Sequence, residues 1–386
     1  MATNVLNKGR LINFINGITG VSPGGQAVVN MPVNSRYHRN VFQCKAVNYT
    51  GGTGLTTTVL TGAGNDDLTV TPTVVNGVIT AVAVVAGGTG YTTGDTITIN
   101  DATGQGFVGT VTAAAGVVTA VAVTSVGIAT PISPRSFFTS VKFLVNGVNM
   151  RDITVDSIMR IAMASGYIPA LGELPVFFTP PWRNVNQQNE VTSWDLFGQS
   201  TFQIQLGISP NVTSPSLVGI QEFDYMRNVR PDAKGNPVPF LQPTAQHQFS
   251  WPIVAGRNDI NTLPFDFPIS RMWLLGSNPG NISQVEVFQD GNKVAEYTLE
   301  QLKQAYTEYG FNFGQPNYVN QNWATDDTLK AAYEQPVYFD AAFIADPDQR
   351  WWKALKCSNQ MILRVYSDVA QTLTIVQETL PGSFAS

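Results

Sequence analysis

The chain has 386 residues, of which 43% are hydrophobic and only 13% are charged, and its formal net charge is −5. This length exceeds the usual size of one hydrophobic core, so we expect two or three domains. The acidic balance excludes a broad nucleic-acid-binding surface, because such surfaces need clustered Lys and Arg. Low charge with abundant Gly (34) and Pro (23) favours strands and turns, and a weakly charged exterior favours oligomerisation.

Residues 1–20 are interpreted as an N-terminal arm. They lack the continuous apolar segment of a signal peptide, and nowhere in the chain do 18 apolar residues follow one another. We therefore expect neither export nor a membrane span, and synthesis in a cytoplasm. The arm carries apolar side chains beside two basic ones: Leu6, Leu11, Ile12, Phe14 and Ile15 with Lys8 and Arg10.

The segment between Lys45 and Arg135 contains no Lys or Arg and is rich in Gly, Thr, Val and Ala. It repeats internally at an offset of 39, where NGVITAVAVVAGG (76–88) matches AGVVTAVAVTSVG (115–127). Strands of period two separated by Gly-rich turns predict a small all-β module at residues 50–133. We expect it to leave from a loop of the first domain and to project outward.

A second, longer repeat organises the rest of the chain. Residues 137–167 align without a gap with residues 281–311, at an offset of 144. Each copy predicts a strand, a tight hairpin at Asn146-Gly147 or Asp290-Gly291, and a second strand. The shared order indicates duplication of a whole β-rich domain.

A short helix is predicted at the end of each copy. Thr154 and Thr298 are expected N-caps, and Gln301 completes a capping box with Thr298. Gly166 and Gly310 are expected to end the two helices. Alternating segments elsewhere, such as TFQIQLGI (201–208), are typical of β-sandwich strands. Two tandem β-sandwiches follow.

Motifs that carry chemistry are sparse, and no catalytic, cofactor-binding or metal-binding residue is predicted. The GxGxxG at Gly104, Gly106 and Gly109 is not followed by a helix pattern, so it is interpreted as a turn. His38 and His247 are the only histidines and lack an HExxH or GxSxG context, which leaves only a triad assembled from distant segments as an alternative. We expect Cys44 and Cys357 to be reduced and buried.

Three groups of residues have two interpretations. The module aspartates could share calcium, although solvated turn residues are the favoured interpretation: Asp66, Asp67, Asp95 and Asp101. Asp346 and Asp348 could form a carboxylate pair, but the Pro between them favours a turn. The tryptophans could form a ligand platform, but core or subunit-interface anchors are favoured: Trp182, Trp351 and Trp352.

The chain resembles the double jelly-roll major capsid proteins of membrane-containing icosahedral bacteriophages, in particular the corticovirus type. Three segments carry the resemblance: INGITGVSPGGQAVVNMPVNSRYHRNVFQCKAV, SVKFLVNGVNMRDITVDSIM, and the stretch from ISRMWLLGSNPGNISQVEVFQDGNKVAEYTLEQLKQAYTEYGF through QPVYFDAAFIADPDQRWWKALKCSNQMILRVYSDVAQTLTIVQE. The resemblance covers about two thirds of the chain. The inserted module departs from that pattern.

The resemblance implies an all-β fold of two tandem eight-stranded jelly rolls, at residues 21–250 and 251–386, with the module at 50–133 interrupting the first. It also implies a homotrimer that forms a pseudo-hexagonal tile of a virion shell over an internal membrane. Neighbouring trimers, penton proteins and minor capsid or membrane proteins are then the expected partners, and no enzyme activity or cofactor is expected.

The sequence is compatible with two positions of the arm and with three functions. The arm at residues 1–20 either contacts the internal lipid bilayer or lies between subunits. A trimeric receptor-binding or spike protein is the alternative function, and a carbohydrate-active enzyme or lectin is a third. Neither coiled-coil heptads for a stalk nor a clear carboxylate pair is present in the sequence.

Overall fold

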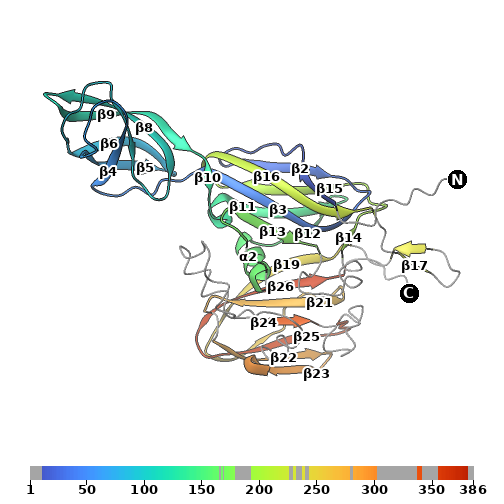
Figure 1. The fold of residues 1–386 in the computed structure, drawn as a ribbon. Coiled ribbons are helices and arrows are strands. Elements are labelled where there is room, and N and C mark those ends of the chain that lie inside the picture. The colour runs from blue at the N-terminus through green and yellow to red at the C-terminus, as the bar shows by residue number, and fades with distance from the viewer. Residues whose placement is uncertain are drawn as a thin grey trace, which may run out of the picture.

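The computed structural model describes residues 11–164, 167, 169–178, 193–225, 229–231, 237–239, 243–278, 281–301, 337–340 and 355–380. The predicted all-β class is confirmed, because nearly every element is a strand. Figure 1 shows two β-sandwiches stacked on each other and a smaller β module that projects from one corner of the first. No helix in the described ranges has the length and apolar character to cross a membrane.

The first sandwich has two sheets. One contains, in order, β1 (Leu11–Ile15), β16 (Thr213–Asp224) and β3 (Arg36–Val47), with β10 (Thr130–Pro131), β13 (Glu173–Phe177) and β14 (Trp194–Asp195) also paired to β3. The other contains β2 (Gln26–Met31), β15 (Phe202–Ile208), β11 (Phe138–Val145) and β12 (Val148–Asp152). Helix α1 (Pro134–Phe137) precedes β11, and a small hairpin joins β17 (Val229–Pro231) to β18 (Pro237–Pro239).

The second sandwich repeats this plan. Its first sheet contains β19 (Ala245–Ile253), β26 (Gln371–Thr379), β21 (Ile269–Gly276) and β24 (Val337–Asp340). Its other sheet contains β20 (Gly256–Ile260), β25 (Met361–Ser367), β22 (Ile282–Gln289) and β23 (Asn292–Thr298). Helix α2 (Val155–Ala164) lies between the two sandwiches (Figure 1).

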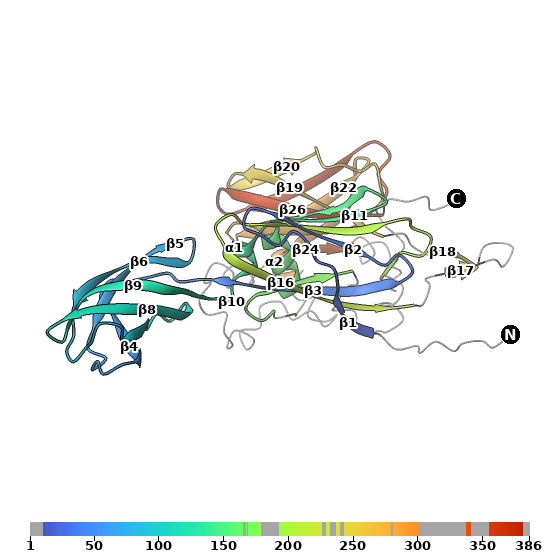
Figure 2. The same ribbon diagram turned by 90° about the horizontal axis from the view of Figure 1, so that it is seen from above.

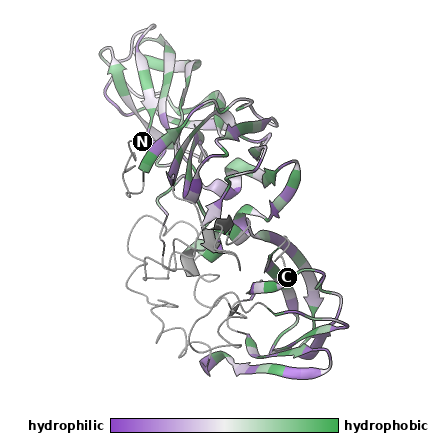
Figure 3. Ribbon diagram, turned by 90° about the vertical axis from the view of Figure 1, so that its right-hand side faces the viewer, coloured by the Kyte–Doolittle hydropathy of each residue, from purple (hydrophilic) through white to green (hydrophobic). Residues whose placement is uncertain are grey.

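Alternating side chains build the core. Hydrophobic and hydrophilic residues alternate along many strands, as the green and purple bands of Figure 3 show. The inward side chains of both sandwiches form one contiguous hydrophobic cluster. Its first-sandwich part centres on aromatic rings in edge, tilted or stacked contact, with centroids 4.8–6.4 Å apart: Tyr37, Phe143, Phe178, Trp194 and Phe202.

The duplication extends to strand register. Strands β11 and β12 are shifted in register between Phe143 and Leu144, and β22 and β23 are shifted at the corresponding place, between Val287 and Phe288. A second shift, in the pairing of β11 with β15, lies after Phe138 and likewise recurs in the pairing of β22 with β25. Because β-bulges are conserved within protein families, two bulges at equivalent positions support a common ancestry of the two sandwiches.

The predicted turns and caps of the duplicated unit are confirmed where they are described. Asn146 and Asp290 both adopt positive φ, 52° and 50°, as a type I′ hairpin requires. Thr154 Oγ1 accepts a hydrogen bond from Ser157 N. Thr298 and Gln301 form the reciprocal capping box. The expected helix ends at Gly166 and Gly310 lie outside the described residues.

The module has a hydrophobic core of its own. Its sheet runs β6 (Val78–Ala86), β5 (Thr69–Val75), β4 (Leu55–Thr61), β7 (Thr96–Ile99), β8 (Gln105–Ala114) and β9 (Val117–Ile128). The chain enters from the end of β3 and returns through β10, which pairs beside it with Thr130 opposite Ala46. The two connections are therefore adjacent strands, and the module extends away from both sandwiches (Figure 2).

The module is itself a duplicate. Hairpin β5–β6 has the register pairs Val75–Val78 and Thr71–Ala83, and hairpin β8–β9 has Ala114–Val117 and Thr110–Ala122, each shifted by 39 residues. Both register shifts recur at the same offset. The strand order is symmetric about the β4–β7 pair, so the module consists of two three-stranded units related by a pseudo-twofold axis.

Two element positions differ from the sequence interpretation. Residues 11–15, assigned to the arm, form β1 and pair with β16. The proposed boundary between residues 250 and 251 falls inside β19, which belongs to the second sandwich's first sheet. Both differences have one cause: the sheet to which a strand belongs is defined by its pairing partners, and the pairing is not visible in a local pattern.

Candidate assembly surfaces

The two histidines lie in different sheets. His38 on β3 is buried, and its Nε2 lies 2.8 Å from Asp224 Oδ2 on β16. The same oxygen accepts a hydrogen bond from Arg36 Nη2 at 2.6 Å. His247 lies on β19, opposite Asp152 of β12. His38 thus belongs to a buried ion-pair cluster that ties the ends of two strands, a role that sequence reasoning missed because its partner is 186 residues away.

The module aspartates hold loops. Asp67 accepts hydrogen bonds from Thr89 Oγ1 and N, and these bonds lower the pKa of its carboxyl. Asp95 is bonded in the same way by Thr92 N and Oγ1, with the same effect on its pKa. The other two accept backbone N–H groups: Asp66 from Val59 and Asp101 from Gly51. In the described part of the chain, no three His, Cys, Asp or Glu residues are grouped so that they could hold a metal ion.

No helix follows the glycine motif, but the turn interpretation is wrong for Gly106 and Gly109, which lie within strand β8. Gly104 lies against the ring of Tyr49, where a Cβ atom would be 2.3 Å from the ring carbons. Tyr49 also accepts a hydrogen bond from Phe107 N at 2.8 Å. The motif therefore serves close packing within the module core.

Both cysteines are free thiols. Cys44 is buried, as expected, and burial raises the pKa of its thiol to about 12. Cys357 is only partly buried, which corrects the expectation of full burial, and burial raises its pKa to about 11. Several expected residues lie outside the described ranges: Trp182, Asp346, Asp348, Trp351 and Trp352.

The two sandwiches share one continuous eight-stranded sheet. Strand β12, at the edge of the first sandwich, pairs in parallel with β19 of the second, with Arg151 opposite Gln246. Side chains reinforce this joint. Gln248 on β19 accepts hydrogen bonds from Thr154 N and Ser157 Oγ at the start of α2, and Arg160 of α2 donates to Gly276 O at 2.8 Å.

A buried arginine lies at the centre of the joint. The Arg151 guanidinium carbon is 4.5 Å from the centroid of the Trp194 ring and 5.0 Å from that of Phe178, and Nη1 donates to Phe177 O at 2.7 Å. Burial lowers its pKa to about 10. Glu378 lies nearby, paired with Arg271 at 3.2 Å. Cation–π contacts of a desolvated guanidinium contribute about 2 kcal/mol, so this cluster stabilises the first-sandwich side of the joint.

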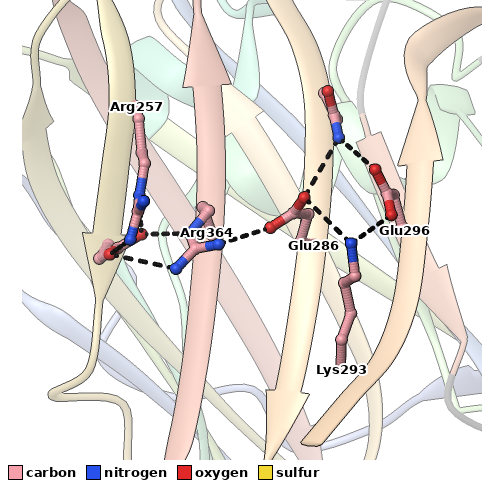
Figure 4. Close-up of polar contacts among 7 residues, drawn as sticks. Arg257, Glu286, Lys293, Glu296 and Arg364 are labelled. Atoms are coloured by element: carbon pink, nitrogen blue, oxygen red, sulfur yellow. Dashed lines mark hydrogen bonds and ion pairs between the residues drawn. The ribbon is translucent and has the colours of Figure 1, made fainter.

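A ladder of charges crosses the outer face of the second sandwich, over all four strands of the sheet β20–β25–β22–β23 (Figure 4). Arg364 bridges Asp259 at 2.6 Å and Glu286 at 2.8 Å. The hydrogen bonds from Arg257 and Arg364 hold the pKa of Asp259 well below its usual range. Lys293 continues the ladder between Glu286 and Glu296. The alternating charges cancel, so the face is polar but nearly neutral.

The corresponding face of the first sandwich carries amides beside one ion pair, Lys142–Asp152 at 3.7 Å. Gln26 donates to Gln205 Oε1 at 3.1 Å, and Gln203 donates to Asn30 Oδ1 at 3.0 Å. Neither face presents a net charge that would repel another subunit. Both are therefore suited to close lateral contact, in which direct and water-bridged polar contacts are common.

Strand β1 presents exposed apolar side chains. Ile12 and Phe14 are each 65% exposed and lie two residues apart, on the same side of an edge strand. Glu222 of β16, which is opposite Ile12, pairs with Arg39 of β3 at 3.2 Å. Large exposed apolar side chains grouped on an edge strand make β1 a candidate contact surface.

The fold has counterparts among solved structures. The major capsid protein P2 from bacteriophage PM2 superposes with a TM-score of 0.55 at 12% identity, over 97% of this chain and 99% of P2. The chain has the double jelly-roll fold. Lower scores are found for the major capsid protein of STIV (0.48, 8% identity, 97% of each chain) and that of Faustovirus (0.44, 9% identity, 96% of this chain and 89% of that one). No protein-family model and no curated protein sequence matches the chain.

The double jelly roll accounts for the two-sheet plan of each sandwich and for the register-level duplication. Each sandwich of this chain is one jelly roll, and the β12–β19 pair joins the two rolls edge to edge. The inserted module interrupts the first roll between β3 and β10.

Proposed function

We propose that this chain is the major capsid protein of an icosahedral virus, and that it forms pseudo-hexagonal homotrimers that tile the virion shell over an internal membrane. The observation that carries the proposal is the double jelly-roll fold, matched over nearly the whole of the phage PM2 capsid protein. Three chains with two rolls each supply six similar sandwiches, which suits a six-sided tile.

The surfaces support an assembling subunit. The outer faces of both rolls are polar and nearly neutral, and β1 offers apolar side chains at an edge. A catalytic role is not proposed, because His38 is engaged with Arg36 and Asp224 in an ion-pair cluster that holds two strands. Virion location, synthesis in the host cytoplasm, and contacts with penton, minor capsid or membrane proteins follow from the proposal.

The domain division belongs to the same proposal. The first roll spans roughly 21–244, with β1 added from the arm, and the second spans 245–386, so that β19 is included whole. The module at 50–133 is proposed to point away from the shell, because it projects from one corner on two adjacent strands (Figure 2). The residues before β1 are proposed to contact the membrane face.

Light scattering after size exclusion tests the proposal. A species near 125 kDa, three times the 41.8 kDa chain, is expected for the recombinant protein, and electron micrographs should show three-fold particles with a six-sided outline. A stable monomer at micromolar concentration would contradict it. Vesicle flotation with and without residues 1–10 tests the membrane contact separately, and equal flotation of both forms would reject it.

A further inference from the structure

The joint between the two rolls pairs two different kinds of edge strand, one from each roll. At the joint, β12 of the first roll pairs with β19 of the second. Strand β23 corresponds to β12, because both close the same hairpin with the same bulge. Strand β1 corresponds to β19, because the strand orders β1–β16–β3 and β19–β26–β21 match. In each roll the first strand pairs antiparallel with the second, β1 with β16 and β19 with β26. Among the described strands, β23 and β1 each have one edge without a strand partner.

We propose that β23 of one copy pairs in parallel with β1 of the next copy and so repeats the β12–β19 joint between molecules. Correspondence of the registers places Ala295 opposite Ile12 and Glu296 opposite Asn13, as Arg151 is opposite Gln246 and Asp152 opposite His247. The inference deepens the proposed function, since it rests on the trimer and names the edges that build it.

The correspondence of β1 with β19 is supported by a repeated ion pair. Arg39 and Glu222 in the first roll occupy the places of Arg271 and Glu378 in the second, next to the same bulge, and both pairs have a separation of 3.2 Å. Their exposure differs. The side chains of Arg271 and Glu378, covered at the joint, are 10% and 5% exposed, whereas those of Arg39 and Glu222 are 30% and 15% exposed. A chain docked on β1 would cover the second pair as the joint covers the first.

The side chains at the two joints differ in a complementary way. At the internal joint a buried Arg151 faces the polar Gln246. At the proposed joint both positions are apolar, since Ala295 replaces the arginine and Ile12 replaces the glutamine. The 65% exposure of Ile12 is thus explained by a partner that is supplied by another copy.

The contacts at the helix N-termini show the same replacement of a polar residue by an apolar one. Gln248 of β19 accepts hydrogen bonds from Thr154 N at the start of α2, but the corresponding residue of β1 is Phe14, which cannot accept them. In the second roll Thr298 N is satisfied by Gln301 of its own capping box. The β23 end therefore needs no amide from β1, and an apolar Phe14 is compatible with it.

The geometry of this contact is heterologous, because two different edges meet. Heterologous contacts close into a ring when the rotation between neighbours divides a full turn. The internal joint already relates two rolls by one such step, and repeating it between chains continues the same direction around the ring. Figure 1 places β23 at the end of the second roll farthest from the first, so the two free edges do not compete for one site.

A cysteine pair tests the register. Asn13→Cys and Glu296→Cys are combined in full-length protein with Cys357→Ser, which removes the partly exposed native thiol. Mild oxidation is expected to give dimer and trimer bands on a non-reducing gel, because register neighbours lie within the Cα range of a disulfide. Asp152→Cys with His247→Cys is the positive control, since these two are opposite each other within one chain. Asn13→Cys with Asn292→Cys, displaced by four residues along β23, should not cross-link.

An association measurement gives a second readout. Ile12→Lys with Phe14→Lys is expected to weaken trimer association by about 100-fold, because two large apolar side chains lose their burial. Val85→Lys, at an equally exposed valine of the module (61%), should leave association unchanged. A trimer that forms without the Asn13–Glu296 cross-link, while the internal control closes, would overturn the edge pairing and leave the capsid proposal standing. A wild-type monomer would overturn both.

Discussion

Asn146 and Asp290 occupy the same position in the two rolls and hold the same kind of loop. Asn146 Oδ1 accepts hydrogen bonds from Ser200 N and Thr201 N, ahead of β15. Asp290 accepts them from the backbone N–H groups of three residues ahead of β25: Ser358, Asn359 and Gln360. One side chain at a hairpin turn thus fixes the start of the neighbouring strand in each roll.

Replacing Asp290 should separate these two tasks. Asp290→Ala removes the acceptor and places alanine at a positive φ, so we expect a lower thermal midpoint at pH 7. Asp290→Asn keeps an acceptor oxygen and tolerates the turn, as Asn146 does, and should lose less. An unchanged midpoint for the alanine variant would show that the loop is held by other contacts.

The same residue predicts a pH dependence. The backbone N–H groups of Gln360, Ser358 and Asn359 lower the pKa of the Asp290 carboxyl in the folded chain. Its stabilisation is therefore fully present above the ordinary aspartate pKa of about 3.9 and is lost as the pH falls through the lowered folded value. The difference between wild type and Asp290→Ala should shrink between pH 5 and pH 2, whereas the Asn variant should not share that trend.

Removing the arginine of the joint should be costly. Arg151→Ala leaves a cavity beside Trp194 and removes the donor to Phe177 O, so we expect a loss of about 3–5 kcal/mol in the free energy of unfolding. Arg151→Met fills the space without a charge and should lose less. Lys142→Ala, at a half-exposed position of the neighbouring strand, is the control and should change stability by less than about 0.5 kcal/mol. Chemical denaturation measures all three.

The module should be removable. Because Thr130 is paired with Ala46, residues 49–128 can be replaced by a short Gly-Ser turn that keeps β10 on β3. The shortened chain is expected to remain folded and to keep the oligomeric state of the full chain, since the module has a separate core. Only a few contacts are lost, such as the bond from Thr213 Oγ1 to Asn76 O. Aggregation of the shortened chain would show that the module supports the first roll.

The pseudo-twofold axis of the module predicts matched effects. A Cβ atom at Gly104 would lie 2.3 Å from the ring of Tyr49, and one at Gly64 would lie 2.3 Å from the ring of Tyr91. Gly104→Ala and Gly64→Ala should each destabilise the module by about 1–3 kcal/mol. Calorimetry should show a lower module transition with the transition of the rolls unchanged. A shift confined to one variant would argue against equivalent halves.

Local features were predictable from the sequence, and long-range pairings were not. The turns at Asn146 and Asp290 and the capping box at Thr298 depend on neighbouring residues, and each lies where the sequence placed it. The fixed-offset match ends after one hairpin and helix because the segments that lead to the next shared strand differ in length. Phe202 pairs with Val145 and Met361 with Gln289, so the duplication continues in space after it is lost in sequence.

The candidate surfaces were only partly predictable. Ile12 and Phe14 were recognised as apolar residues of an arm, but their position on an edge strand depends on pairing with β16, some 200 residues later. The Arg36–His38–Asp224 cluster and the joint at Arg151 depend on strand neighbours in the same way. Charge ladders such as Arg364 with Glu286 require knowledge of register, which a single strand does not contain.

The β12–β19 joint lies within one polypeptide, and this affects how a shell would grow. Two rolls on one chain meet at an effective concentration set by their connection and not by the number of molecules in the cell. Every second contact around a six-roll ring is then made while the chain folds, before any encounter with another subunit. Only the remaining contacts depend on protein concentration, so these can be weak and reversible, and a misplaced subunit can dissociate before the shell closes around it.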